Sequence, residues 1–126
     1  MALENNKIIL IYGFHKDEEN TLDNLLKKNK LPSYRVMEKS MAKMKVKDIL
    51  NGLNLGIYNS NLPDEKVVLL NNFSDEEVQT MLASIRGKFS PSPILAVVTE
   101  TSIDWTLEYL IEHLLEEREW YKNRSK

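Results

Sequence analysis

Residues 94–105 decide the fold that the sequence predicts, and they read Ile94-Leu95-Ala96-Val97-Val98-Thr99-Glu100-Thr101-Ser102-Ile103-Asp104-Trp105. An uninterrupted apolar run ends at a group of hydroxyl and acidic residues. A charged amphipathic segment then begins with a tryptophan. This order predicts a buried strand, a tight turn and the start of the longest helix in the chain.

Working outward, two more apolar runs, 7–12 and 66–70, predict strands that are covered on both faces, as we also expect for 94–98. Residues 34–38 alternate in polarity and predict an edge strand. Apolar residues at helical spacing predict helices around Leu22, around Ile49, around Met81, and from Ile103 towards Tyr121.

Alternating strands and helices predict an α/β fold in a single domain, residues 1–126. We expect one four-stranded, mainly parallel sheet with helices on both faces. The alternative is a ferredoxin-like α+β sheet, in which two strand-helix-strand units interlock. Residues 53–65, rich in Asn, Gly and Pro, predict the one long loop.

The pattern is written twice. Lys66-Val67-Val68-Leu69-Leu70 follows Lys7-Ile8-Ile9-Leu10-Ile11 at an offset of 59 (66 − 7 = 59), and at that offset Phe73 matches Phe14 and Pro91-Ser92 matches Pro32-Ser33. Ser74-Asp75-Glu76-Glu77 predicts a capping box in the second copy. We therefore predict an internal repeat of strand-helix-strand-helix units, 7–50 and 66–111, joined by loop 53–65.

Composition excludes several function classes. The net charge of −2 lacks the basic excess that binding to nucleic acid requires. There is no cysteine, and His15 and His113 lack the spacing of a zinc site, so no metal or other cofactor is expected. No apolar run approaches the ~18 residues of a membrane span, and the first residues lack a secretory pattern. We expect a cytoplasmic protein without membrane contact.

The second half carries a family resemblance. Val67-Val68-Leu69-Leu70-Asn71-Asn72-Phe73-Ser74-Asp75-Glu76-Glu77, then Pro93 to Thr99, then Trp105-Thr106-Leu107, resemble the bacterial family called domain of unknown function 3783. The likeness covers residues 66–119. Glu100, Ser102 and Asp104 depart from the family pattern, which favours proline at the first position and asparagines at the other two. The resemblance implies no activity, substrate or cofactor.

Two strand-to-helix turns are candidate ligand sites. Thr99, Thr101, Ser102 and Asp104 lie where α/β proteins bind ligands, beyond a strand and before a helix. A helix cap explains the same hydroxyls, and Glu100 and Asp104 would repel an anion. His15, with Asp17 nearby, lies on the corresponding turn of the first copy and is a candidate general base without an evident nucleophile.

The last predicted helix has an aromatic line beside its aliphatic face, formed by Tyr109, His113, Trp120 and Tyr121 together with Trp105. Aromatic residues beyond the last aliphatic core position pack back onto the domain or contact a partner. Our leading hypothesis is therefore a small non-enzymatic binding or regulatory module that contacts a protein partner or a second copy. The alternative is a small enzyme using the turns at His15–Asp17 and Thr99–Asp104.

Overall fold

Two antiparallel strands, β1 (Ile8–Tyr12) and β3 (Val67–Asn71), form the centre of the sheet in the computed structural model, which describes residues 7–53, 62–90 and 92–124. β2 (Tyr34–Val36) pairs parallel with β1, and β4 (Ile94–Val97) pairs parallel with β3. The order is β2-β1-β3-β4. The sheet is thus mixed, and the prediction of a mainly parallel sheet is wrong at its central pair.

The short helix α2 (Val46–Leu50) lies between β2 and β3 in the chain. Its five residues rise only ~7.5 Å, whereas a strand of five residues is ~17 Å long. The helix alone therefore does not carry the chain back to the end of the sheet where β1 and β2 began. β3 starts instead beside the end of β1, where Val67 pairs with Tyr12.

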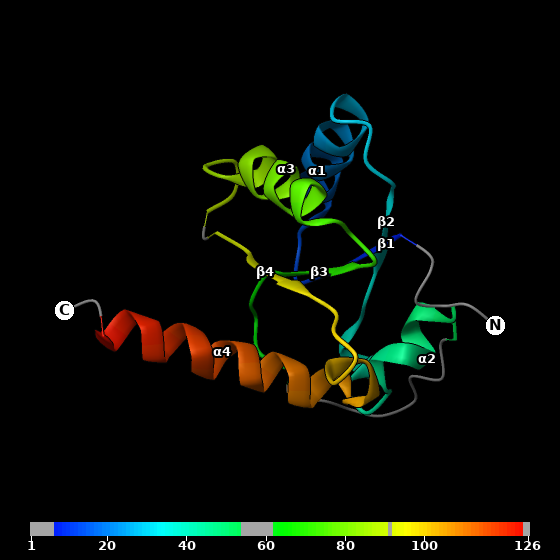
Figure 1. Ribbon diagram of the computed structural model, residues 1–126, viewed down its shortest axis with the longest axis vertical. Coiled ribbons are helices and arrows are strands. Elements are labelled where there is room, and N and C mark those ends of the chain that lie inside the picture. The colour runs from blue at the N-terminus through cyan, green and yellow to red at the C-terminus, as the bar shows by residue number, and fades with distance from the viewer. Residues whose placement is uncertain (1–6, 54–61, 91, 125–126) are drawn as a thin grey trace.

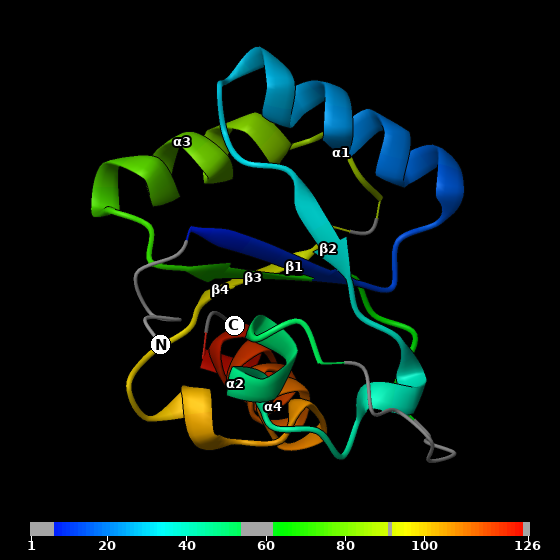
Figure 2. The same ribbon diagram turned by 90° about the vertical axis from the view of Figure 1, so that its right-hand side faces the viewer.

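Helices cover both faces of the sheet, as predicted. α1 (Lys16–Lys28) and α3 (Asp75–Ile85) lie on one face, and α2 and α4 (Leu107–Arg124) lie on the other (Figures 1 and 2). The two strands of each strand-helix-strand unit are direct neighbours rather than interleaved. The ferredoxin-like alternative is therefore wrong.

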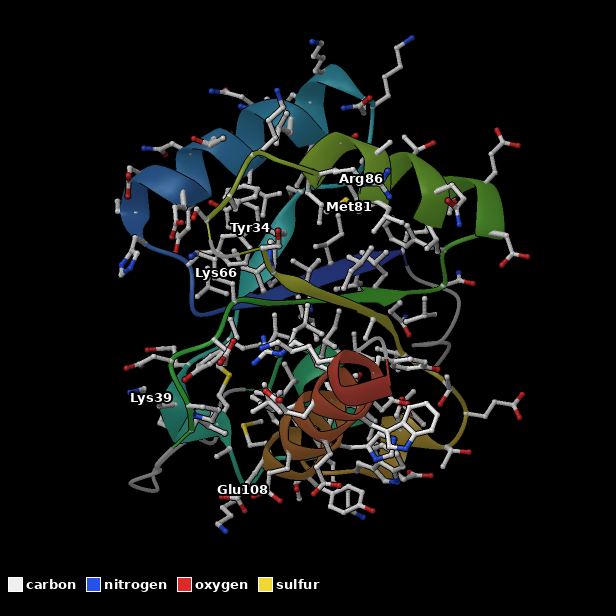
Figure 3. The ribbon with its side chains drawn as sticks, turned by 90° about the vertical axis from the view of Figure 1, so that its left-hand side faces the viewer. Tyr34, Lys39, Lys66, Met81, Arg86 and Glu108 are labelled. Atoms are coloured by element: carbon white, nitrogen blue, oxygen red, sulfur yellow. The ribbon has the colours of Figure 1, made fainter. Side chains whose placement is uncertain are left out.

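The core consists of two apolar clusters, one on each face of the sheet. Alternate residues of β1 and β3 point to opposite faces, and every residue of both strands is buried. Leu22 and Met81 complete the cluster under α1 and α3, and Figure 3 shows Met81 between α3 and the sheet. The other cluster contains the apolar face of α4 and three buried methionines, Met37, Met41 and Met44.

The outer strands differ from their predictions in one respect. β2 is an edge strand, as its alternating polarity indicates. β4 was expected to be covered on both faces, but it is the other edge strand: its residues are only partly buried, and Val97 is 43% exposed. Its apolar run reads like that of a central strand because no charged residue interrupts it.

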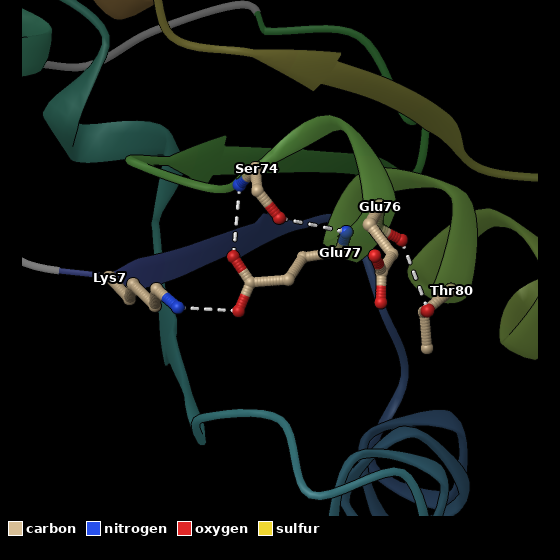
Figure 4. A network of polar contacts seen from close by, with 5 residues as sticks. All are labelled: Lys7, Ser74, Glu76, Glu77 and Thr80. Carbon is tan, nitrogen blue, oxygen red and sulfur yellow. Dashed lines mark hydrogen bonds and ion pairs between the residues drawn. The ribbon is translucent and has the colours of Figure 1, made fainter.

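Two similar polar networks hold the helix starts against the central strands. The Ser74 hydroxyl accepts from the Glu77 amide at 3.2 Å while the Glu77 carboxylate accepts from the Ser74 amide at 2.9 Å, so the predicted capping box is confirmed. Figure 4 shows Lys7 completing this network through an ion pair with Glu77. At the start of α1, the Glu18 carboxylate accepts from the His15 amide and pairs with Lys66.

Gly13 lies in the turn between β1 and α1. Its φ is +85°, and a Cβ atom there would lie 2.0 Å from the carbonyl oxygen of Glu65, just before β3. Both the left-handed backbone and the close approach of the two chain segments require glycine. Asn72 follows β3 with a φ of 63°, which asparagine tolerates better than most residues.

We predict that Gly13→Ala lowers the free energy of unfolding by clearly more than Gly87→Ala. Gly87 also has a positive φ, +74°, but nothing lies within 4 Å of a Cβ atom there. The control should therefore lose only ~1 kcal/mol of stability, because alanine is strained in the left-handed region. Gly13→Ala should lose at least ~1 kcal/mol more. Urea denaturation of both variants measures the difference, and equal midpoints would contradict the close approach.

A second prediction concerns pH. Burial raises the pKa of Glu18, but hydrogen bonds from the His15 amide and Lys66 lower it more, so the net pKa is below the ordinary value. A carboxyl whose pKa is lowered on folding stabilises the fold above its unfolded pKa, about 4.3, and loses that contribution as pH falls through the folded pKa. Lys66 is only 7% exposed, so it depends on this partner.

We therefore expect Glu18→Gln to cost about 1–3 kcal/mol at neutral pH. The difference in unfolding free energy from wild type should narrow as pH falls from about 4.3 through the lower pKa of folded Glu18, where the wild-type carboxyl also becomes neutral. Glu38→Gln, at an exposed position, serves as the control. Denaturant titrations across this pH range test the prediction, which fails if the gap stays constant.

Candidate functional site

The turn after β4 is closed by its own hydroxyls. The Ser102 hydroxyl accepts from the Thr99 amide at 2.9 Å, and the Thr99 hydroxyl accepts from the Ser102 amide at 3.0 Å. The two hydroxyls are also in hydrogen-bond contact, and Ser102 is buried. These predicted ligand residues therefore stabilise the 3₁₀ turn η3 (Ser102–Asp104).

The cap of the last helix lies further along than predicted. α4 begins at Leu107 rather than near Ile103, and the hydroxyl of Thr106 accepts from the Tyr109 amide at 3.2 Å. The expectation that Thr101 or Ser102 caps this helix is wrong, because η3 separates the turn from it. The sequence does not distinguish a short 3₁₀ turn from the first turn of a helix.

A cavity of about 420 Å³ lies at the carboxyl ends of β3 and β4, lined by Asn71, Asn72, Val98, Thr99, Glu100 and Ile103. Of the predicted ligand residues it includes only Thr99. Asp104 instead forms an exposed ion pair with Lys47 at 3.2 Å. Among the residues that the structure describes, the lining contains one carboxylate and no basic side chain, which is unfavourable for an anion.

His15 lies far from this turn. It precedes α1 at the end of β1, whereas Thr99 follows β4. Because β1 is antiparallel to β3 and β4 is parallel to β3, the two turns lie at opposite ends of the sheet. The structure does not bring His15 together with Thr99, Thr101, Ser102 or Asp104, so these residues do not form one site.

The aromatic line on α4 is a contiguous cluster near the start of the helix. The ring of Trp105 contacts that of Tyr109 edge-on at 4.8 Å between centroids and that of His113 at 5.1 Å. Tyr109 and His113 are stacked at 6.5 Å. Trp105 also packs against the core cluster under α4, as expected of an anchor, while Tyr109 is 52% exposed.

Trp120 and Tyr121 form a second aromatic pair near the end of α4. Their rings meet edge-on at 4.9 Å, and the two side chains are 52% and 64% exposed. Figure 1 shows these last turns of α4 projecting past β4. A shallow pocket of about 360 Å³ is lined by both aromatics together with His113, Glu116 and Glu117.

A groove of about 340 Å³ connects this pocket to the sheet, and sequence reasoning missed it. It is lined by strand and turn residues on one side and by residues of α4 on the other: Leu95, Ala96, Val97, Thr99, Ser102, Trp105, Leu110, His113, Leu114 and Glu117. Three consecutive strand residues point to alternating faces, so a groove that meets all three lies along the outer edge of β4. His113 and Glu117 line both hollows.

Arg118 fixes the projecting end of α4 to the segment before β3. Its guanidinium donates to both carboxylate oxygens of Glu65, at 2.8 and 3.1 Å. The hydrogen bond to Arg118 lowers the pKa of Glu65, and the same bond raises the pKa of Arg118. Residues 54–61 of the predicted loop, including Leu55, Ile57 and Tyr58, lie outside the described residues.

The described ranges hold neither a cluster of three or more His, Asp or Glu side chains able to bind a metal ion nor a helix long and apolar enough to cross a membrane. The chain was also compared with known proteins. Residues 66–121 match the family Domain of unknown function (DUF3783). The resemblance predicted for residues 66–119 is thereby confirmed. None of the curated proteins and none of the solved structures in the comparison matches the chain.

The DUF3783 segment contains every residue of the groove and of the two aromatic groups. It starts at β3 and includes α3, β4 and most of α4. The candidate surface is therefore built by this segment alone. The first half of the chain supplies the other central strand, β1, and the helix α2. Both contribute residues to the core cluster against which α4 packs.

We predict that Glu65→Gln speeds amide hydrogen exchange in the last turns of α4 by about two- to fivefold, since an exposed ion pair contributes up to ~1 kcal/mol. Glu108→Gln is the matched control, because Glu108 pairs with Lys43 near the start of the same helix. The control substitution should speed amide exchange only in the first turns of α4. Equal exchange at residues 116–121 in both variants would show that Arg118 does not restrain this end.

Proposed function

We propose that the protein is a non-enzymatic binding module that acts in the cytoplasm through protein–protein contacts, and that the exposed face of α4 is its contact surface. The surface comprises Tyr109, His113, Trp120 and Tyr121. The observation that carries the proposal is the pair Trp120 and Tyr121, more than half exposed on helical turns that project past the sheet. The cytoplasmic location and a bacterial source stay predictions from the sequence.

The energetics favour a partner over permanent exposure. Burying a large aromatic side chain is worth roughly 2 kcal/mol or more, and tryptophan and tyrosine dominate the energy of many protein interfaces. The bidentate pair between Arg118 and Glu65 restrains these turns before binding, which lowers the ordering cost of binding.

The enzyme hypothesis receives less support. A site using both turns would need His15 and Thr99 near each other, and antiparallel pairing of β1 and β3 separates them. At the turn after β4, Thr99 and Ser102 satisfy each other, and Asp104 pairs with Lys47. A nucleophile with an adjacent base, the minimum for covalent catalysis, is not among these contacts.

We also propose that residues 7–50 and 66–111 are two copies of one unit. The supporting contacts recur at a fixed offset. Leu10 pairs with Leu69, its counterpart 59 positions later (69 − 10 = 59). Two ion pairs join the start of a central strand to the start of a helix in the other unit: Lys66 with Glu18, and Lys7 with Glu77. The two lysines are 59 positions apart, as are the two glutamates, so each ion pair is the counterpart of the other.

From the second strand of each unit onward the offset is 61, as the pairs Ile9 with Tyr34 and Val68 with Leu95 show (95 − 34 = 61). The Val46 amide donates to the Trp105 carbonyl, and the Leu107 amide donates to the Met44 carbonyl, each at 2.9 Å (107 − 46 = 61). These are the contacts expected if the two helix starts are related by a twofold axis. An experimental structure tests the duplication: superposition that fails beyond one strand and one helix would contradict it.

To test the binding function, p-benzoylphenylalanine should replace Tyr121 in the full chain, and cells expressing it should be irradiated. We expect an adduct of defined mass, with a partner protein or a second copy, that weakens several-fold when Trp120→Ala is added. Gln79, exposed on α3, is the control position for the same photoreactive residue. Adducts that are absent at Tyr121, or identical at Gln79, would contradict the proposal.

A further inference from the structure

The outer edge of β4 is unusually open to pairing. β4 and the next residue, Val98, carry no charged side chain and no proline, and both are common devices that keep edge strands from pairing with other chains. The opposite edge strand β2 has only three residues, and one of them is Arg35. Within the described ranges, β4 pairs with β3 alone.

The hydrogen-bonding groups of this edge point into the groove. The amides of Ile94 and Val98 donate to Lys66 and Leu70, respectively, so these residues face the partner strand. The alternate residues Leu95 and Val97 therefore direct their amides and carbonyls away from β3. Both residues also line the groove between β4 and α4.

α4 extends under the position that an added strand would occupy. Its 18 residues span ~27 Å, whereas the outer strands of a four-stranded sheet are only ~14 Å apart. The helix crosses the sheet obliquely and continues past β4 (Figures 1 and 2). A fifth strand beside β4 would rest on the turns that carry Leu114, Glu117 and Trp120.

The far end of the groove is acidic and aromatic. Glu116 and Glu117 line the same pocket as Trp120 and Tyr121. Among the described contacts, Glu117 faces only His113, at 3.7 Å, and no ion pair involves Glu116. A lysine or arginine side chain would meet two carboxylates and the faces of aromatic rings, which attract cations.

We propose that the groove binds an extended segment of a partner protein, which adds a strand to the outer edge of β4 and places a basic side chain between Glu116, Glu117 and Trp120. This inference rests on the proposed binding function and names the chemistry of its partner. A second copy paired through the same surface fits less well, because it would bring another uncharged strand and the same carboxylates.

The test uses fluorescein-labelled nine-residue peptides of alternating threonine and valine, with one arginine scanned along the peptide, and the full-length protein. Matched peptides carry citrulline, which has nearly the shape of arginine without its charge. Fluorescence anisotropy should show at least one arginine position that binds about tenfold more tightly than its citrulline match. Equal affinity of every pair would overturn the proposal.

Two variants, one control variant and one measurement on wild type locate the site. Glu116→Gln/Glu117→Gln should abolish the preference for arginine, whereas Glu112→Gln/Glu119→Gln, with the same charge change on the same helix, should retain it. Val97→Pro removes an outward amide and should abolish binding of the arginine peptide. In wild type, the bound peptide should slow amide exchange at Leu95 and Val97; unchanged exchange there would overturn strand addition even if Val97→Pro does not fold.

The outcomes separate this inference from the proposed function. If the photoreactive residue at position 121 captures a protein while the arginine peptides bind no better than the citrulline peptides, the binding function stands and the basic strand is wrong. If neither capture nor peptide binding occurs, both proposals fail. Peptide binding that survives the loss of Glu116 and Glu117 unchanged also overturns the assigned pocket.

Discussion

The antiparallel pairing of β1 with β3 is the constraint on which the rest of the structure depends. Both strands are buried on both faces, so neither can shift its register by a residue without exchanging the two core clusters. Gly13 lets the chain turn directly against the carbonyl of Glu65, which sets the end of the pair. The ion pairs of Lys7 and Lys66 then fix α3 and α1 to it.

This central pair also determines where a binding site can form. Antiparallel strands send the turns after β1 and after β4 to opposite ends of the sheet, so the hydroxyl and imidazole groups of the two turns cannot combine. The central pair also leaves the sheet with two edge strands that differ in length and charge. At one edge the short β2 carries Arg35, whose guanidinium donates to the carbonyl of Leu50. At the other edge, β4 is uncharged and the longest helix lies beside it.

Local chemistry made much of this predictable. The apolar runs at 7–12 and 66–70, the capping box at Ser74 and the inward faces of α1 and α4 follow from side-chain periodicity and from hydrogen bonds within one turn. Strand direction was not predictable, because it depends on the path of the chain between β2 and β3, which side-chain periodicity does not report. The apolar run at 94–98 was misread as central because periodicity reports hydrophobicity and not the number of neighbouring strands.

The candidate surface was only half predictable for a related reason. Trp120 and Tyr121 stand out in the sequence because they follow the last aliphatic core position of their helix. The groove does not stand out in the sequence. It forms only because β4 is an edge strand and because α4 crosses beneath β4 and continues past it. The two features are physically linked: a helix that ended at the sheet edge, as α2 ends at Leu50, would leave an added strand without support. Under the proposed duplication, the second unit therefore differs from the first in the two properties that strand addition requires, an uncharged edge and a helix long enough to support it.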